Sequence, residues 1–173
     1  YNHKQSLESW NNIEGGIESL FGRCDWFYSA VDAWCDNPNT AKATYGHIST
    51  WDTSHITDMS ELFSSQRKPS CLTFNENINN WNVSSVTDMS HMFSRASSFN
   101  QPLNSWDVSS VTNMAFMFNA APSFNQPLNS WDVSSVTDLY ATFEGATSFN
   151  QPLNAWDVSR VTSMGYMFHY ASS

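Results

Sequence analysis

Basic residues are scarce in this chain. Of its 173 residues only 7 are Lys or Arg, against 16 Asp or Glu, so the formal net charge at pH 7 is −9. Nucleic acids and anionic membranes are bound mainly through clusters of Lys and Arg. The composition therefore predicts no nucleic-acid partner. The sequence also has no apolar run of about 18 residues, so we expect no membrane insertion of this stretch.

Cysteine is also rare, and Cys24, Cys35 and Cys71 lack the spacing of metal ligands. If one straight helix carries Cys24 and Cys35, these two cannot pair, because the helix would separate them by about 16 Å. A disulfide from the N-terminal region to Cys71 would attach that region to the repeats. Three reduced thiols are the alternative, and the sequence leaves the pairing open.

Groups that could carry catalysis are missing as well. There is no Ser/His/Asp motif and no phosphate-binding glycine loop, and the five histidines are scattered without ligand spacing at positions 3, 47, 55, 91 and 169. We therefore predict that the protein is not an enzyme and has no cofactor, with a divalent cation on a row of aspartates as the one alternative.

The chain contains one sequence unit that is repeated five times. Each copy opens on a tryptophan, and the full unit reads W-D-V-S-S-V-T-D-M-x-x-M-F-x-x-A-x-S-F-N-Q-P-L-N-S. The tryptophans are residues 51, 81, 106, 131 and 156, and the first gap is longer because of an insertion near residues 66–72. A fixed period of 20–50 residues is typical of a solenoid, in which each unit covers the apolar side of its neighbour.

The pattern within a unit predicts a strand, a turn and a short helix. Leu103, Trp106 and Val108 follow the strand signature of leucine-rich repeats. Thr112 is placed to cap a helix whose buried face would carry the methionines and the phenylalanine that follow. The predicted fold class is an α/β solenoid: a leucine-rich-repeat-like stack of about five strand-turn-short-helix units with a parallel β-sheet, preceded by an α-helical N-terminal cap.

Two segments make up the predicted domain organisation. Residues 1–46 would be a lead-in and helical cap, with a helical pattern over 17–35 and a second helix that Asn37 caps, Pro38 begins and Gly46 ends. Residues 47–173 would be the repeat solenoid, with units starting near 48, 78, 103, 128 and 153 and the first strand starting at 47–51. We expect the edge of the stack after Ala171 to be open, with more chain or a polar cap beyond it.

The units resemble the BspA-like leucine-rich repeats of surface proteins, in the 25-residue form found in mycoplasma lipoproteins. The matching segments are Trp81–Asn104, Trp106–Asn129, Trp131–Asn154, Trp156–Ala171 and, in part, Trp51–Phe63, and the lead-in from Ala30 to Ile48 is similar to that of algal or protist members. The resemblance implies a secreted or surface-displayed protein that acts in adhesion or protein–protein interaction. It implies no enzymatic activity.

The first candidate binding surface is the expected strand face. Its outward positions would form a row of polar side chains about 4.8 Å apart, in which Asn82 interrupts a series of carboxylates. The members of this row are Asp52, Asn82, Asp107, Asp132 and Asp157. A cation could bridge neighbouring carboxylates. Alternatively, each side chain could bond to a serine or backbone amide of its own turn.

The second candidate binding surface is the expected outer helix face, where the copies differ from one another. Helical period would direct these variable side chains away from the core, yet several are large and aromatic: His91, Phe116, Tyr140, Tyr166 and Tyr170. A cluster of exposed aromatic residues is typical of a contact surface. Packing of these rings on each other, or drift on a solvated face, is the alternative.

From these features we predict a non-catalytic extracellular or cell-surface module that binds a protein or glycan partner. One alternative is a structural building block of a fibre, coat or large assembly that joins like subunits. A second alternative is a cation- or lattice-binding grid of Ser and Asp.

Overall fold

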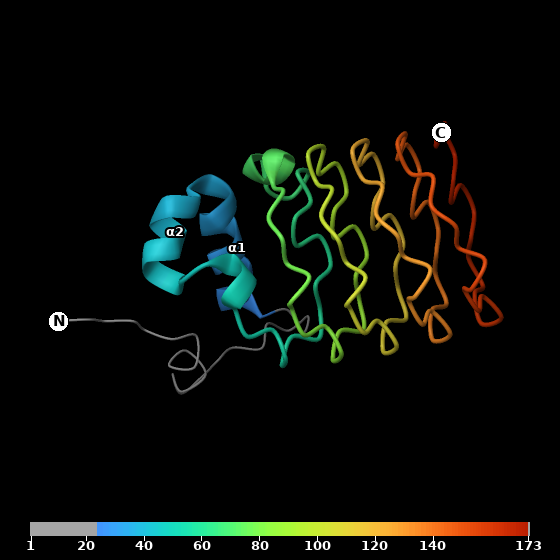
Figure 1. Cartoon of the computed structure of the whole chain (residues 1–173), viewed down its shortest axis with the longest axis horizontal. Helices are drawn as coiled ribbons and strands as arrows, with labels where there is room; N and C mark the ends of the chain where they lie inside the picture. The colour runs from blue at the N-terminus through green and yellow to red at the C-terminus, as the bar shows by residue number, and fades with distance from the viewer. Residues whose placement is uncertain (1–23, 173) are drawn as a thin grey trace.

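The computed structural model describes residues 24–172. Two helices lie at one end, α1 (Asp25–Asp36) and α2 (Pro38–Tyr45), and successive loops of chain stack away from them toward the other end (Figure 1). Two short 3-10 helices follow, η2 (Ile48–Thr50) and η3 (Pro69–Thr73). We call each repeating loop a coil, numbered one to five by its tryptophan. The predicted lead-in over residues 1–16 and the start of the helical pattern at residue 17 lie outside the described residues.

The local sequence explains both helices. The α1 helix buries the apolar residues that recur at three- and four-residue steps, among them Phe27, Val31 and Trp34. Asn37 caps α2 by accepting a hydrogen bond from the Thr40 backbone N–H at 3.1 Å. Pro38 is the first residue of α2, and Gly46 follows its last residue with a φ of 78°. The predicted capping of this second helix is confirmed.

The predicted fold class is wrong. Residues 24–172 contain no β-strand and no sheet, and neither α-helix lies within the repeating coils. The β-type pairing between neighbouring coils is limited to isolated parallel bridges between aligned residues: Asp58 with Asp88, Asp88 with Asn113, Asn113 with Asp138, and Asp138 with Ser163. The coils are therefore not leucine-rich-repeat units, and the expected first strand at residues 47–51 is instead the 3-10 helix η2.

Backbone conformation explains why the expected short helices are absent. Two aligned positions in the coils adopt a left-handed φ, which a right-handed helix does not tolerate. The first is occupied by Glu61, His91, Phe116, Ala141 and Tyr166, and the second by Arg95, Ala120, Gly145 and Tyr170. The buried methionines and phenylalanines after Thr112 thus lie on a series of tight turns. Their spacing is compatible with a helix, but the backbone N–H groups of the turns bond to the next coil.

These bonds join each coil to the next in one direction. In the third coil the N–H groups of Met114, Phe116, Phe118 and Ala120 donate to carbonyls of the fourth coil at 2.7–3.0 Å. The accepting residues are Asp138, Tyr140, Thr142 and Glu144. The aligned groups of every other pair of neighbouring coils repeat the arrangement. Each coil therefore presents a row of donors on one side and a row of acceptors on the other.

Aromatic rings fill the inside of the stack in columns. Phe93, Phe118 and Phe143 are fully buried, and their ring centroids lie 5.6 Å apart in nearly parallel planes. The indoles of Trp106, Trp131 and Trp156 stack in the same way, at 6.4 Å. Because a ring in one coil rests on the same ring of the next, the repeated sequence itself generates the core.

Each of these indoles also makes a hydrogen bond that a purely apolar side chain could not. The Trp106 Nε1–H donates to the Ile78 carbonyl at 3.1 Å, and Trp131 and Trp156 donate to the leucine carbonyl at the same place in the preceding coil. In the first coil Trp51 donates to the Gly46 carbonyl, and in the second Trp81 donates to the Ile48 carbonyl. The tryptophan thus fixes the register between coils.

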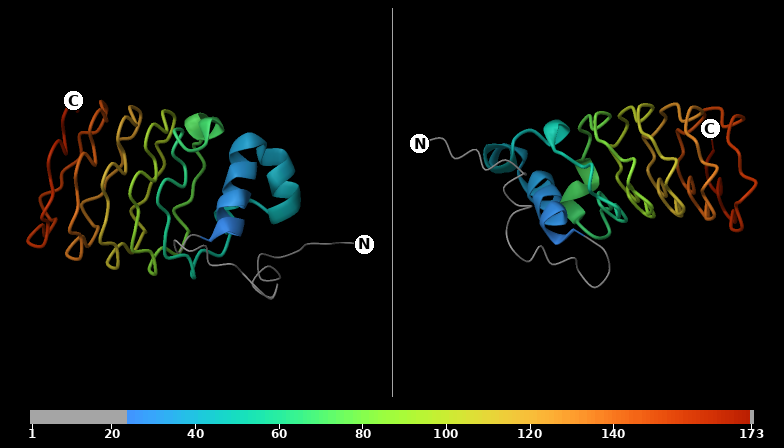
Figure 2. Two further views of the ribbon diagram at one scale, coloured as in Figure 1. Left: turned by 180° about the vertical axis from the view of Figure 1, so that it is seen from behind. Right: turned by 90° about the horizontal axis from the view of Figure 1, so that it is seen from below.

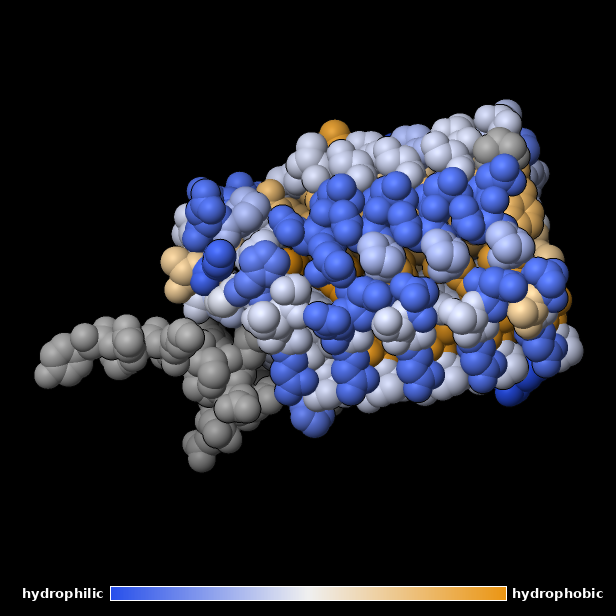
Figure 3. Space-filling view, in the orientation of Figure 1, coloured by the Kyte–Doolittle hydropathy of each residue, from blue (hydrophilic) through white to orange (hydrophobic). Residues whose placement is uncertain are grey.

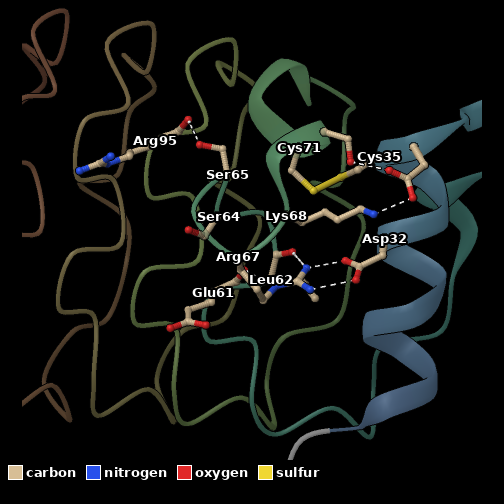
Figure 4. The surroundings of a disulfide bond; sticks show 12 residues. Asp32, Cys35, Glu61, Leu62, Ser64, Ser65, Arg67, Lys68, Cys71 and Arg95 are labelled. Atoms are coloured by element: carbon tan, nitrogen blue, oxygen red, sulfur yellow. Dashed lines mark hydrogen bonds and ion pairs between the residues drawn. A yellow bond between two sulfur atoms is a disulfide. The ribbon is translucent and has the colours of Figure 1, made fainter.

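The insertion at residues 66–72 attaches the helices to the stack. Cys71, in η3, forms a disulfide with Cys35 at the end of α1 (Figure 4). Arg67 makes two contacts with the Asp32 carboxylate, at 2.6 and 3.0 Å, and Lys68 pairs with Asp36 at 2.6 Å. Of the pairings left open by the sequence, the structure thereby selects Cys35 with Cys71.

The same region satisfies the acceptor row of the first coil, which has no preceding coil. The Tyr28 hydroxyl donates to the Ser60 carbonyl at 2.6 Å and lies 3.5 Å from that of Asp58. The Arg67 guanidinium donates to the Leu62 carbonyl at 2.7 Å, and the Lys68 backbone N–H donates to the Ser64 carbonyl at 2.9 Å. Groups of α1 and of the insertion, two side chains and one backbone N–H, therefore supply the donors that a neighbouring coil supplies elsewhere in the stack.

We expect Trp106→Ala to lower the free energy of unfolding by about 3–5 kcal/mol, because it leaves a cavity between coils and an unpaired Ile78 carbonyl. The urea midpoint measured by circular dichroism should fall accordingly. Thr147→Ala, at an exposed position of the fourth coil, serves as the control and should leave the midpoint in place. An unchanged midpoint for the tryptophan variant would contradict the stacking described here.

We expect reduction of the Cys35–Cys71 disulfide to lower the free energy of unfolding by about 2–4 kcal/mol, because it frees a loop with a sequence separation of 36 residues in the unfolded chain. Urea unfolding with and without a thiol reductant measures this difference. The double variant Cys35→Ser/Cys71→Ser should match the reduced protein and should not respond to reductant. A response of this double variant would show that another group is responsible.

Candidate functional site

The predicted carboxylate row exists, although not on a strand. All five side chains are exposed and lie at aligned positions of successive coils: Asp52, Asn82, Asp107, Asp132 and Asp157. In each coil the Oδ1 atom accepts the backbone N–H of the serine two residues later, at 3.0–3.1 Å. The interpretation in which each side chain bonds within its own turn is therefore confirmed.

These bonds stabilise the charged form of the carboxylates. Hydrogen bonds from the Ser54 side chain and backbone lower the pKa of Asp52, and the Ser134 side chain and backbone do the same for the pKa of Asp132. For Asp157 the backbone N–H of Ser159 is the main cause of the lowered pKa, followed by the Ser159 hydroxyl. Asp52, Asp132 and Asp157 are thus held in the charged form, and one oxygen of each of these carboxylates already accepts a hydrogen bond inside the protein.

A second row of polar oxygens runs beside the parallel bridges. Asp88 Oδ1 accepts the Ser90 N–H at 2.8 Å, and Asn113 and Asp138 repeat this bond in their coils. These residues were expected to begin a helix, and they form turns instead. Among residues 24–172, no three His, Cys, Asp or Glu side chains come together in a group that could hold a metal ion. The cation on the aspartate row stays an untested prediction.

The variable aromatic residues do not lie on a helix face, because the coils have none. Phe116 and Tyr166 occupy the first left-handed position of their coils, as does His91, and Tyr170 occupies the second. Exposure rises toward the C-terminal end: Phe116 and Tyr140 are half-buried, whereas Tyr166 is 58 % exposed and Tyr170 is 74 % exposed. The expectation that all variable positions point outward is wrong, since Ala141 and Ser94 are fully buried.

The structure brings these aromatic rings together in one continuous file. The His91 and Phe116 rings stack with centroids 4.5 Å apart, Phe116 lies 5.3 Å from Tyr140, and Tyr140 lies 5.7 Å from Tyr166. The file then continues through His169 to Tyr170. Packing of the rings on each other, one of the readings considered above, is thus part of the arrangement. We call these six residues the aromatic file.

Tyr140 reaches the file from a neighbouring position. The left-handed position of the fourth coil is Ala141, which has no ring, and the Tyr140 side chain lies across Gly165 of the fifth coil instead. A Cβ at Gly165 would lie only 3.0 Å from the Tyr140 ring. The small residues Ala141 and Gly165 therefore provide the space that the Tyr140 ring occupies. The residue at each of these three variable positions thus restricts which residues fit at the other two.

Polar groups accompany the aromatic file at its C-terminal part. His169 Nδ1 lies 3.2 Å from Glu144 Oε1, and the Asn119 amide donates to Glu144 Oε2 at 3.0 Å. At the other end, partial burial lowers the pKa of His91, so its ring is more readily neutral. The file as a whole offers ring surface with carboxylates nearby: Glu144 at its C-terminal part, and Glu61 and Asp88 near His91.

One further exposed feature is the outer side of the fifth coil, the edge that was expected above to be open. Val158, Met164 and Phe168 are 40–50 % exposed, whereas Val133, Leu139 and Phe143 at the same places in the fourth coil are 0–1 % exposed. Apolar surface is visible at this end of the molecule, next to flanks covered by rows of polar residues (Figure 3). The two further views show this coil at the far end of the stack from the helices (Figure 2).

Other groups have structural roles. His47 Nδ1 lies 2.8 Å from the Ser49 hydroxyl and caps η2, which accounts for this His–Ser contact without catalysis. The Asn75, Asn100 and Asn125 side chains each accept a backbone N–H of the next coil at 2.9–3.0 Å, as expected for an amide ladder. No helix within residues 24–172 has the length and apolarity needed to cross a membrane.

Comparison with known proteins adds a family to this description. The sequence pattern of a family described as "Mycoplasma protein of unknown function, DUF285" matches residues 36–141 and again residues 103–173. No curated protein and no solved structure matches the chain. The matched segments cover all five coils and the second helix, which is well over half of the chain. The protein is therefore a member of the DUF285 family.

Proposed function

We propose that this protein is a non-catalytic, surface-displayed binding module that contacts a protein or glycan partner through the aromatic file. The observation that supports this proposal most directly is the continuity of the file: rings from successive coils touch, and those nearest the C-terminal end are largely exposed. Aromatic side chains lose little conformational entropy on binding and bury large areas, so they dominate binding energies at many interfaces.

The framework suits this role because the rings sit on a rigid backbone. Each residue at the first left-handed position donates its N–H to the next coil wherever a next coil is described, as Phe116 does to Tyr140 at 2.8 Å. The main chain is thus fixed, whereas the side chain at this position differs from coil to coil. A partner would therefore meet a preorganised surface whose chemistry is set by a few exchangeable residues.

An extracellular or cell-surface location is part of the proposal. The Cys35–Cys71 disulfide supports it, because such bonds persist in oxidising compartments and are rare in reducing ones. The scarcity of Lys and Arg also supports a partner other than nucleic acid. The adhesive role implied by the resemblance to surface proteins belongs to this proposal.

A role as building block of a fibre, coat or larger assembly is the alternative proposal. This role does not require the aromatic file to bind a different kind of partner, so the two can be tested separately.

We expect Phe116→Ser to weaken binding at least about tenfold and to leave the fold intact, because truncation of a central aromatic residue at an interface costs upward of about 1.4 kcal/mol. Labelled protein on arrays of immobilised glycans and peptides identifies a ligand, and titration of that ligand measures the loss. Far-UV circular dichroism and the urea midpoint establish that the variant is folded.

The matched control is Asp107→Asn in the same coil. Asn82 makes the same turn in the second coil, so this variant keeps the fold and changes only the aspartate row. It should bind as the unchanged protein does. Loss of binding in Asp107→Asn with retention in Phe116→Ser would contradict the proposal and favour the grid of Ser and Asp, and no binding on any array would contradict it as well.

A further inference from the structure

One member of the exposed row of polar side chains differs chemically from the others. Asn82 stands in the second coil where the remaining coils have aspartate, at residues 52, 107, 132 and 157. A carboxylate offers only oxygen atoms, whereas an amide also carries a nitrogen. The second coil therefore presents an atom at this position that the other four coils lack.

This difference completes a short motif. Asn82, Val83 and Ser84 form the sequence Asn-x-Ser with a middle residue other than proline, which is the acceptor pattern for N-linked glycans. No other asparagine among the 173 residues has Ser or Thr two positions later. Because every coil has a serine at the place of Ser84, the exchange of aspartate for asparagine alone creates the motif.

The structure presents Asn82 to solvent on a well-anchored backbone. Asn82 is exposed, whereas Trp81 and Val83 on either side of it are only 3 % and 1 % exposed. The Asn82 backbone carbonyl also accepts the Thr53 hydroxyl of the preceding coil at 2.9 Å. Because both neighbouring side chains are in the core and the Asn82 side chain is not, a group attached to this side chain would extend away from the core.

Hydrogen bonds orient the Asn82 amide. Its Oδ1 atom accepts the Ser84 backbone N–H at 3.1 Å and the Ser84 hydroxyl at 2.7 Å, so the two functional groups of the motif are in contact. Among residues 24–172, no group accepts a hydrogen bond from the Asn82 Nδ2 atom. The oxygen is thus used inside the protein, and the nitrogen, the atom that carries the sugar in an N-linked glycan, is left for substitution.

We propose that Asn82 carries an N-linked glycan. The donor is an oligosaccharide joined to a lipid diphosphate, and a membrane-bound oligosaccharyl transferase moves it. The Nδ2 atom forms a bond to the anomeric carbon of the sugar and loses one proton to a base of the transferase. The bond from that carbon to the diphosphate oxygen breaks, and the lipid diphosphate leaves with the electron pair. The inference rests on the extracellular or cell-surface location proposed above, since such acceptor sites are used in secreted proteins.

The glycosylated product fits the structure. The substituted amide keeps its Oδ1 atom, so both hydrogen bonds from Ser84 remain after the sugar is attached. A glycan is bulky and hydrophilic, so it would shield Asp52 and Asp107, at the aligned positions of the two neighbouring coils, from a protein partner.

The test expresses the 173-residue chain behind a secretory leader in a eukaryotic host cell. Because the leader sets the compartment, the result does not depend on the natural location of the protein. Intact-mass spectrometry of the secreted protein should show a mass above that of its sequence, and treatment with peptide N-glycosidase should remove the excess. Peptide mapping should place the carboxylate that this enzyme leaves behind at position 82.

Four variants locate the modification and separate it from folding. Asn82→Asp should lose the excess mass and keep the urea midpoint, because aspartate makes the same turn in the other four coils. Ser84→Ala should also lose the excess mass, whereas Ser84→Thr should keep it. Asp132→Asn creates the motif in the fourth coil, where Oδ1 already accepts the Ser134 N–H at 3.0 Å, and should gain a second glycan.

A secreted, folded protein without excess mass would overturn the proposal, as would a glycan that persists in Asn82→Asp. An unmodified residue 82 in surface-exposed protein isolated from its natural source would overturn it as well. Phe116→Ser should be glycosylated to the same extent as the unchanged protein. Failure of the aromatic file as a binding site would therefore leave these results in place, so the two proposals fail separately.

Discussion

The hydrogen bond from one coil to the next is the constraint on which the rest of this structure depends. A coil folded into tight turns leaves many backbone N–H and C=O groups without hydrogen-bond partners in the same coil. Burying these groups unpaired would destabilise the folded state. The chain solves this by repeating the coil, so that groups of Met114, Phe116 and their neighbours meet the matching carbonyls of the fourth coil. Identical rings then fall on one another, and the core follows from the register.

Because these backbone hydrogen bonds run in one direction, the first coil presents unpaired acceptors toward the helices. At the first coil the acceptors need donors from elsewhere, and the chain supplies them from α1 and from the insertion, two segments about 35 residues apart. Arg67 does two things there: it pairs with Asp32 and it covers the Leu62 carbonyl. The candidate binding residues of the molecule lie between these features, on the flanks of the stack.

The candidate binding sites show how far sequence reasoning reaches. The aspartate row could be predicted because the repeat places one residue at one position of every coil, and its local bonding to serine follows from the chemistry of Asp and Ser. The aromatic file could be predicted only as a set of variable positions. Tyr140 joins the file by lying across Gly165, next to the left-handed backbone at Ala141. The spacing of residues in the sequence does not predict this arrangement, because the same spacing also fits a helix.

The sequence by itself determined that five copies of a unit stack, which side chains lie inside, and where α2 begins and ends, because these follow from period, apolarity and capping residues. The tertiary structure alone decided that the coils are built of turns and not of strands and helices. The spacing of apolar residues in the sequence predicts which side chains are buried. It does not predict the positive φ at Phe116 or Gly145. It also decided which cysteine pairs with Cys71 and how Tyr28 meets Ser60, because contacts between segments far apart in the chain exist only once both are folded.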